Sequence, residues 1–206
     1  MALSAQDKIM YVANKLGLST LKDMQGSTGA VYDIDRTATG VMFANASQHA
    51  FPGDTNLNSN RFEVNEALLI ETIAFFVDGQ GISAWLGNLN QAYAGNLVIV
   101  FDLIIGNKKV MKDTPVWVAG QPGTFASTGF YTDTTQAITG GVALAPRHQI
   151  FMEGAGILIP PQVEFELNYK LYNVQSGAEV AIDGDTAPIG CYLYGTKVNL
   201  NFNTTL

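Results

Sequence analysis

Two histidines, His49 and His148, are the side chains of this sequence that could act as a base near neutral pH. Catalysis would require a nucleophile and an orienting group beside one of them. Neither histidine stands in a nucleophile motif such as Gly-x-Ser-x-Gly. A lone histidine is more often structural, so the two histidines predict no acid–base chemistry.

Glu164 and Glu166 are two residues apart in a strand-like segment, so their carboxylates lie on the same face. Glycosidases use such a pair on either side of a sugar cleft. Further acidic and tryptophan residues are expected near a cleft of that kind, but Trp85 and Trp117 lie far away in the sequence. We therefore interpret the pair as the solvated face of a strand, and we expect no catalytic residues and no enzyme activity.

Two aspartate pairs, Asp33 with Asp35 and Asp183 with Asp185, could offer oxygen ligands to calcium. Neither pair has the spacing of an EF-hand loop, and Asp-Gly is first of all a turn signal. The Gly140-Gly141 segment lacks the Lys-Ser/Thr ending of a phosphate-binding loop. We expect no bound metal and no cofactor, and the sequence leaves a metal at Asp183 and Asp185 open.

The single cysteine, Cys191, excludes an intramolecular disulfide, and the sequence has no Cys-x-x-Cys or zinc-type histidine spacing. Cys191 lies between Gly190 and Tyr192 in a strand-like run. A buried thiol is the prediction.

The composition favours a folded chain with little charge. Charged residues make up 14% of the 206 residues, against about 25% in an average globular protein. Aromatic residues at 10% and apolar residues at 47% argue against disorder. Because charged residues are so few, much of the surface must be covered by something other than solvent.

The formal net charge is −7, and the main basic cluster is Lys108 and Lys109 with Lys112. Proteins that bind nucleic acids normally carry a patch of lysine and arginine to displace counterions from phosphates. We do not expect direct nucleic-acid binding.

Asp7, Lys8 and Lys15 interrupt the segment where a signal peptide needs an apolar core, so no secretory signal is predicted. The apolar runs 67–77 and 97–105 are too short to cross a bilayer.

An amphipathic helix is predicted at the start of the chain. Ser4 and Asp7 form a capping pattern, and Gly17 stands where a left-handed C-cap belongs. A helix this short is marginal alone in water, so its apolar face must dock. Protein is the expected surface, and the recurring Lys8, Lys15 and Lys22 leave lipid or genome contact as the alternative. The apolar face contains Ala5, Ile9, Val12, Ala13 and Leu16.

Residues 25–60 are rich in Gly, Ser, Thr, Asn and Asp, with short extended patches only at 31–34 and 41–43. Long segments of this kind are uncommon inside compact domains unless they serve a purpose, such as wrapping a neighbour. We predict that residues 1–60 form the helix and an extended arm, and that residues 61–206 form a β domain.

The β domain is predicted from strand-like runs separated by turn signals. Residues 67–77 and 97–105 form apolar runs, and Val116 follows Pro115 in a separate short element. Near the end, Val163, Phe165, Leu167 and Tyr169 alternate with polar residues, which is typical of a strand with one wet face. About eight such strands predict an all-β fold, an antiparallel jelly-roll sandwich with an N-terminal amphipathic helix and extended arm.

The order of these parts resembles the jelly-roll capsid proteins of tailless icosahedral viruses, bacteriophages in particular. The resemblance covers about two thirds of the chain and is one of pattern. It rests on three segments: Asn65–Val77, Phe101–Val110 and Ile157–Leu167.

The resemblance implies a structural virion protein that self-assembles into an icosahedral shell after synthesis in the host cytoplasm. It implies contacts with copies of itself in a trimer or larger assembly, with other capsid or vertex proteins, and with an internal membrane through the N-terminal helix. The length suggests one jelly roll or two trimmed ones. The missing basic arm departs from capsid proteins that grip their genome directly.

The alternative is a carbohydrate- or receptor-binding β-sandwich, such as a spike or fibre head. Trp117, Phe130 and Tyr131 would then form an aromatic platform for sugars.

Overall fold

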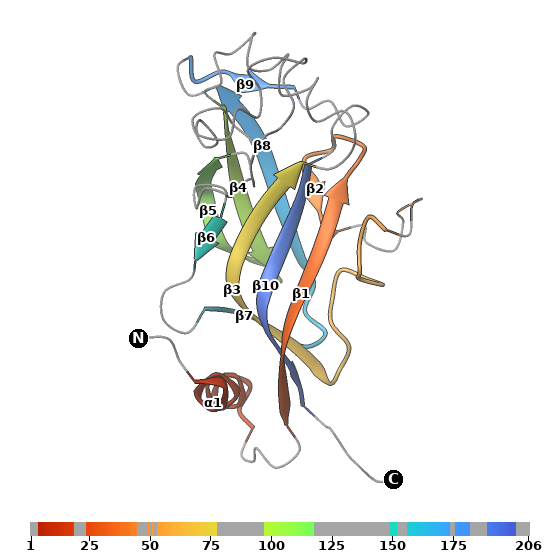
Figure 1. Cartoon of the computed structure of the whole chain (residues 1–206), viewed down its shortest axis with the longest axis vertical. Helices are drawn as coiled ribbons and strands as arrows, with labels where there is room; N and C mark the ends of the chain where they lie inside the picture. Colours follow the sequence, from red (N-terminus) through yellow and green to blue (C-terminus); the bar gives the residue numbers. More distant parts are fainter. Residues whose placement is uncertain are drawn as a thin grey trace, which may run out of the picture.

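The computed structural model places two antiparallel β-sheets face to face, with one short helix against the first sheet (Figure 1). The residues described are 4–18, 24–44, 49, 51, 53–77, 97–117, 149–151, 156–173, 176–181 and 189–200. The chain is mostly β, as predicted for an all-β sandwich.

The first sheet has the order β1-β10-β3-β6, and β7 also pairs with β3. Its strands are β1 (Gln25–Asp35), β3 (Glu66–Val77), β6 (Gln149–Phe151), β7 (Ile157–Ile159) and β10 (Ile189–Asn199).

The second sheet has the order β2-β8-β4-β5, and β9 pairs with β8. Its strands are β2 (Val41–Met42), β4 (Leu97–Ile105), β5 (Lys108–Trp117), β8 (Phe165–Asn173) and β9 (Glu179–Val180).

The strand pairs are nested. The first strand pairs with the last, β2 pairs with β8, β3 pairs with β6 and β7, and β4 pairs with β5 across the turn at Gly106 and Asn107. This is the pairing of a long hairpin that has been folded over, with the strands nearest the chain ends, β1 and β10, in the first sheet and the central hairpin of β4 and β5 in the second.

The core lies between the sheets and is rich in aromatic rings. Phe165 lies with its ring centroid 5.4 Å from that of Phe43 and 5.6 Å from that of Phe62. Phe75 of the first sheet contacts Phe101 of the second, at 5.2 Å between centroids. Aromatic pairs at these distances add stability beyond the area they bury.

Several sequence predictions are confirmed. The apolar runs 67–77 and 97–105 lie in β3 and β4, and the alternating run near residue 165 is β8, whose burial alternates along the strand. The cysteine of β10, Cys191, is fully buried.

The prediction that residues 25–35 belong to an extended arm outside the β domain is wrong. These residues form β1, which pairs with β10 along its whole length. The poor strand formers at its start are held by the neighbouring strand, because pairing and packing outweigh intrinsic β propensity. The prediction of a separate short element after Pro115 is also wrong, since Lys108–Trp117 is one strand. Proline is tolerated there because β5 lies at the sheet edge.

Helix α1 (Ala5–Leu16) is confirmed with both of its predicted caps. Ser4 and Asp7 form the capping box, and Gly17 adopts the left-handed conformation. The buried residue Val12 packs on the outer side of the first sheet. Its partners there are Ala67, Leu69 and Val198. Within the described residues no helix is long and apolar enough to span a bilayer.

A β-bulge in β3 decides which side chains reach this outer face. The pairing register shifts where Ile70 lies opposite Gly195 and Thr72 lies opposite Tyr194, so that Glu71 is the extra residue. Leu68 and Ile70 face the core on one side of the bulge, and Ile73 faces it on the other. The outer face is therefore divided into a part under α1 and a part beyond the bulge.

Candidate interaction surfaces

His49 lies at the edge of the first sheet, beside Asp33 and Asp54. Its Nε2 atom lies 2.7 Å from Oδ1 of Asp33, and its Nδ1 atom lies 3.9 Å from Oδ2 of Asp54. Arg36 Nε donates to Asp54 Oδ1 at 2.6 Å. These bonds fasten the segment after β2 to β1. His148 lies outside the described residues.

Asp33 is buried and accepts hydrogen bonds from the backbone N–H groups of Ile34 and Phe43. Burial raises the pKa of its carboxyl above the ordinary value, although the Phe43 N–H group and His49 act in the opposite direction. Through these two hydrogen bonds the carboxylate holds the backbone of β1 and of the segment after β2 in place.

Asp35, the last residue of β1, accepts hydrogen bonds from the turn that follows it and from the second sheet. They come from Thr37, from the Thr39 hydroxyl, from the Gly40 N–H group at 2.8 Å and from the Tyr169 hydroxyl at 3.1 Å. Burial beside this carboxylate raises the pKa of the Tyr169 hydroxyl. Because donor hydrogens occupy the oxygens that a cation would need, the calcium alternative for Asp33 and Asp35 is disfavoured.

No group of three or more His, Cys, Asp or Glu side chains is placed to hold a metal ion in the part of the chain that the structure describes. The other candidate pair, Asp183 and Asp185, lies outside that part.

The carboxylate pair, Glu164 and Glu166, lies just before and within β8. Glu166 accepts a hydrogen bond from Asn168 Nδ2 at 3.0 Å, and Glu164 is exposed. Both border a hollow of about 170 Å³ that also includes Asn60 and Gly106. Apart from the two glutamates, the residues that line this hollow carry no nucleophile or base.

The basic cluster on β5 is paired with acidic side chains. Lys109 Nζ contacts Asp102 Oδ2, and Lys112 Nζ lies 3.8 Å from Asp113 Oδ2. The hydrogen bond from Lys109 holds the pKa of the Asp102 carboxyl below its usual value. Two of the three lysines are thus partly neutralised.

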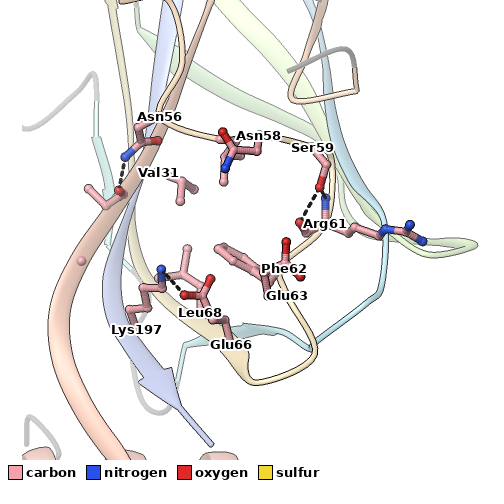
Figure 2. Close-up of a pocket in the computed structure, with 13 residues that line it drawn as sticks. Val31, Asn56, Asn58, Ser59, Arg61, Phe62, Glu63, Glu66, Leu68 and Lys197 are labelled. Atoms are coloured by element: carbon pink, nitrogen blue, oxygen red, sulfur yellow. Dashed lines mark hydrogen bonds and ion pairs between the residues drawn. The ribbon is translucent and has the colours of Figure 1, made fainter. Parts of the chain in front are cut away.

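A cavity of about 280 Å³ lies between the first sheet and residues 56–63 (Figure 2). Val31, Phe62 and Leu68 give it an apolar lining. Asn58 and Glu63 lie at its rim, and the Arg61 guanidinium points away from it. Lys197 and Glu66 close one side through an ion pair of 2.9 Å. Since charges of both signs surround it, the cavity favours no charged ligand.

Two exposed tyrosines lie on the outer face of the first sheet beyond the bulge. Tyr192 and Tyr194 of β10 expose 40% and 46% of their area. Tyr32 of β1 lies opposite Tyr192, with ring centroids 5.4 Å apart. We call this the tyrosine face. It consists of Ala30, Tyr32, Thr72, Ala74, Tyr192 and Tyr194, which are cross-strand neighbours.

None of the six residues of the tyrosine face is charged. Sequence reasoning missed this surface, although the alternation of Tyr192, Leu193 and Tyr194 placed both tyrosines on one side of a strand. The aromatic platform that sequence did suggest cannot be compared with it, because Phe130, Tyr131 and the side chain of Trp117 lie outside the described residues.

Comparisons with protein-family models, with curated proteins and with solved structures find no match to this chain.

Proposed function

We propose that this chain is a structural virion protein, a capsid subunit that assembles with copies of itself into an icosahedral shell. The observation that carries the proposal is the tyrosine face, an uncharged sheet surface with two tyrosines each more than a third exposed. Exposed apolar surfaces of this kind mark interaction sites in soluble proteins. The centres of protein interfaces are enriched in tyrosine and poor in charge.

The nested pairing of the strands supports a jelly roll. A jelly roll is a double-sheet fold of eight strands in two Greek keys, and it occurs in viral capsids and in lectins. The pairs β1–β10, β2–β8, β3–β6/β7 and β4–β5 follow the order expected when one long hairpin is rolled up. The short strand β9 is an addition at the edge of β8.

The docked helix supports contact with protein rather than lipid. Its apolar residue Val12 is already buried against the sheet, and Lys8 is bound to Glu71 at 2.7 Å. An interfacial helix would instead keep its apolar face available to the bilayer. We expect the partners to be further copies of the chain and other shell proteins.

The proposal is tested by measuring particle size with light scattering as protein concentration rises. We expect trimers or larger assemblies, and a monodisperse monomer at high concentration would overturn the proposal. Replacing both tyrosines, as Tyr192→Ser and Tyr194→Ser, should shift the population towards monomers without loss of folding. Val110→Ser is the matched control, because Val110 is 46% exposed on the other sheet.

A sugar-binding spike or fibre head is the second candidate, because flat tyrosine surfaces can stack on sugar rings. Sugar sites also need directed polar groups. On the tyrosine face the neighbours of Tyr192 and Tyr194 are alanines, Tyr32 and a single threonine, which favours protein contact. A selective hit on a glycan array would favour the sugar-binding alternative.

A further inference from the structure

Two of the described strands are both long and at the edge of a sheet, β1 and β5. Free edges present unpaired N–H and C=O groups to other chains, so soluble proteins protect them with lysines, prolines and bulges. β5 carries all of these: three lysines, Pro115, and register shifts where it pairs with β4. The free edge of β5 is therefore protected against pairing with another chain.

The first half of β1 has none of these protections. Residues 25–30 read Gln-Gly-Ser-Thr-Gly-Ala, without a charge or a proline, and their register with β10 has no bulge. Ser27 and Thr28 are exposed. This segment is open to a further strand.

Hydrogen bonds in the second half of β1 show which groups face the open edge. Asn56 accepts from the Tyr32 N–H group and donates to the Ala30 carbonyl, as a neighbouring strand would. Backbone groups alternate along a strand, so the N–H and C=O groups of Gly26 and Thr28 point the same way. Among the described residues, these four groups have no hydrogen-bond partner on that side.

We infer that residues 26–28 of β1 pair antiparallel with the same residues of a second copy about a two-fold axis at Ser27. Gly26 of each copy then lies opposite Thr28 of the other, and each of these two pairs exchanges two hydrogen bonds. Such an isologous contact is the commonest symmetric arrangement in oligomers. It joins the first sheets of two copies, so that their tyrosine faces lie on the same side. The inference rests on the proposed self-assembly for the identity of the partner.

A contact between residues 26–28 of two copies is weak by itself, so the test fixes it with a disulfide. At the axis the two Ser27 residues form a non-hydrogen-bonded pair, whose Cα atoms lie about 4.5 Å apart. Disulfides span about 4.4–6.8 Å between Cα atoms. The one natural cysteine, Cys191, is fully buried. With oxidised glutathione, Ser27→Cys should therefore form a covalent dimer several-fold faster than the control Lys112→Cys on the protected edge of β5, where the side chain is 70% exposed.

Equal rates for the two variants would overturn the inference. Adding Thr28→Pro to Ser27→Cys should abolish the fast reaction, because proline removes an N–H group that β10 does not use. Retained fast cross-linking in the folded double variant would also overturn it. If the proline variant does not fold, Thr28→Lys keeps the backbone and places a charge on each edge, with the same expected loss.

The failure of the proposed shell function can be distinguished from the failure of the β1 pairing. Wild-type shells together with slow cross-linking of Ser27→Cys would overturn the β1 pairing alone. A wild-type monomer at high concentration together with fast cross-linking would overturn the shell and support the pairing.

Discussion

Gly195 of β10 lies against the backbone of Leu69 of β3, so close that a β-carbon at residue 195 would stand 1.9 Å from the Leu69 carbonyl oxygen. The same β-carbon would stand 2.9 Å from the Glu71 nitrogen. The contact occurs where the register between β3 and β10 shifts. The bulge that turns Glu71 outward therefore requires glycine at residue 195.

Gly195→Ala should lower the free energy of unfolding by about 3 kcal/mol, because backbone rather than a movable side chain must shift. Chemical denaturation measures the change. Gly53→Ala is the control, since its β-carbon would meet the ring of Phe51, an exposed side chain that can turn away. Equal effects of the two substitutions would contradict the role given to Gly195.

Val12→Ala should weaken the docking of α1 by about 2 kcal/mol, because it removes methyl groups from a buried contact with the first sheet. Faster proteolysis within the helix, together with a lower urea midpoint, would report the loss. The exposed Asn14→Ala should not weaken docking. A helix that stays equally protected in both variants would argue against docking through Val12.

The ion pair between Lys8 and Glu71 should make helix docking sensitive to acid. Burial raises the pKa of the Glu71 carboxyl, but hydrogen bonds from Lys8 and Thr196 outweigh it and hold the pKa below the ordinary 4.5. This contribution is present above the unfolded pKa and is lost as the pH falls through the lower, folded pKa.

Glu71→Gln should therefore cost up to about 1 kcal/mol of stability near neutral pH, since the pair is partly exposed. The difference between wild type and variant should shrink as the pH falls below 4.5. Denaturation curves at several pH values measure it. A difference that stays constant with pH would contradict the assignment.

Asp35→Ala should lower the free energy of unfolding by about 3 kcal/mol, because it leaves the Gly40 N–H group and the Tyr169 hydroxyl without their acceptor. Tyr169→Phe removes one donor and leaves the carboxylate with its other donors, so about 1 kcal/mol is expected. The ratio of the two losses, measured by chemical denaturation, tests whether Asp35 holds the turn after β1. Comparable losses from the two substitutions would mean that the bond to Tyr169 alone accounts for the contribution of Asp35.

Local patterns sufficed for the helix and for most strands. Ser4, Asp7 and Gly17 bound the helix because caps satisfy backbone groups within a few residues. The alternation in β8 predicted its buried face because side chains of a strand alternate about its plane. Residues 25–30 gave no such signal, since their strand depends on β10, more than 160 residues away in the sequence.

Neighbouring residues alone are enough to predict that the chain is mostly β, that its first residues form a capped amphipathic helix, and that Cys191 is buried. Only the tertiary structure brought His49 to Asp33 and Asp35 to Tyr169, and placed the bulge at Glu71. Pairing between distant strands fixes the register, and the register decides which side chains meet and which stay exposed. The tyrosine face and the open edge of β1 are consequences of that register.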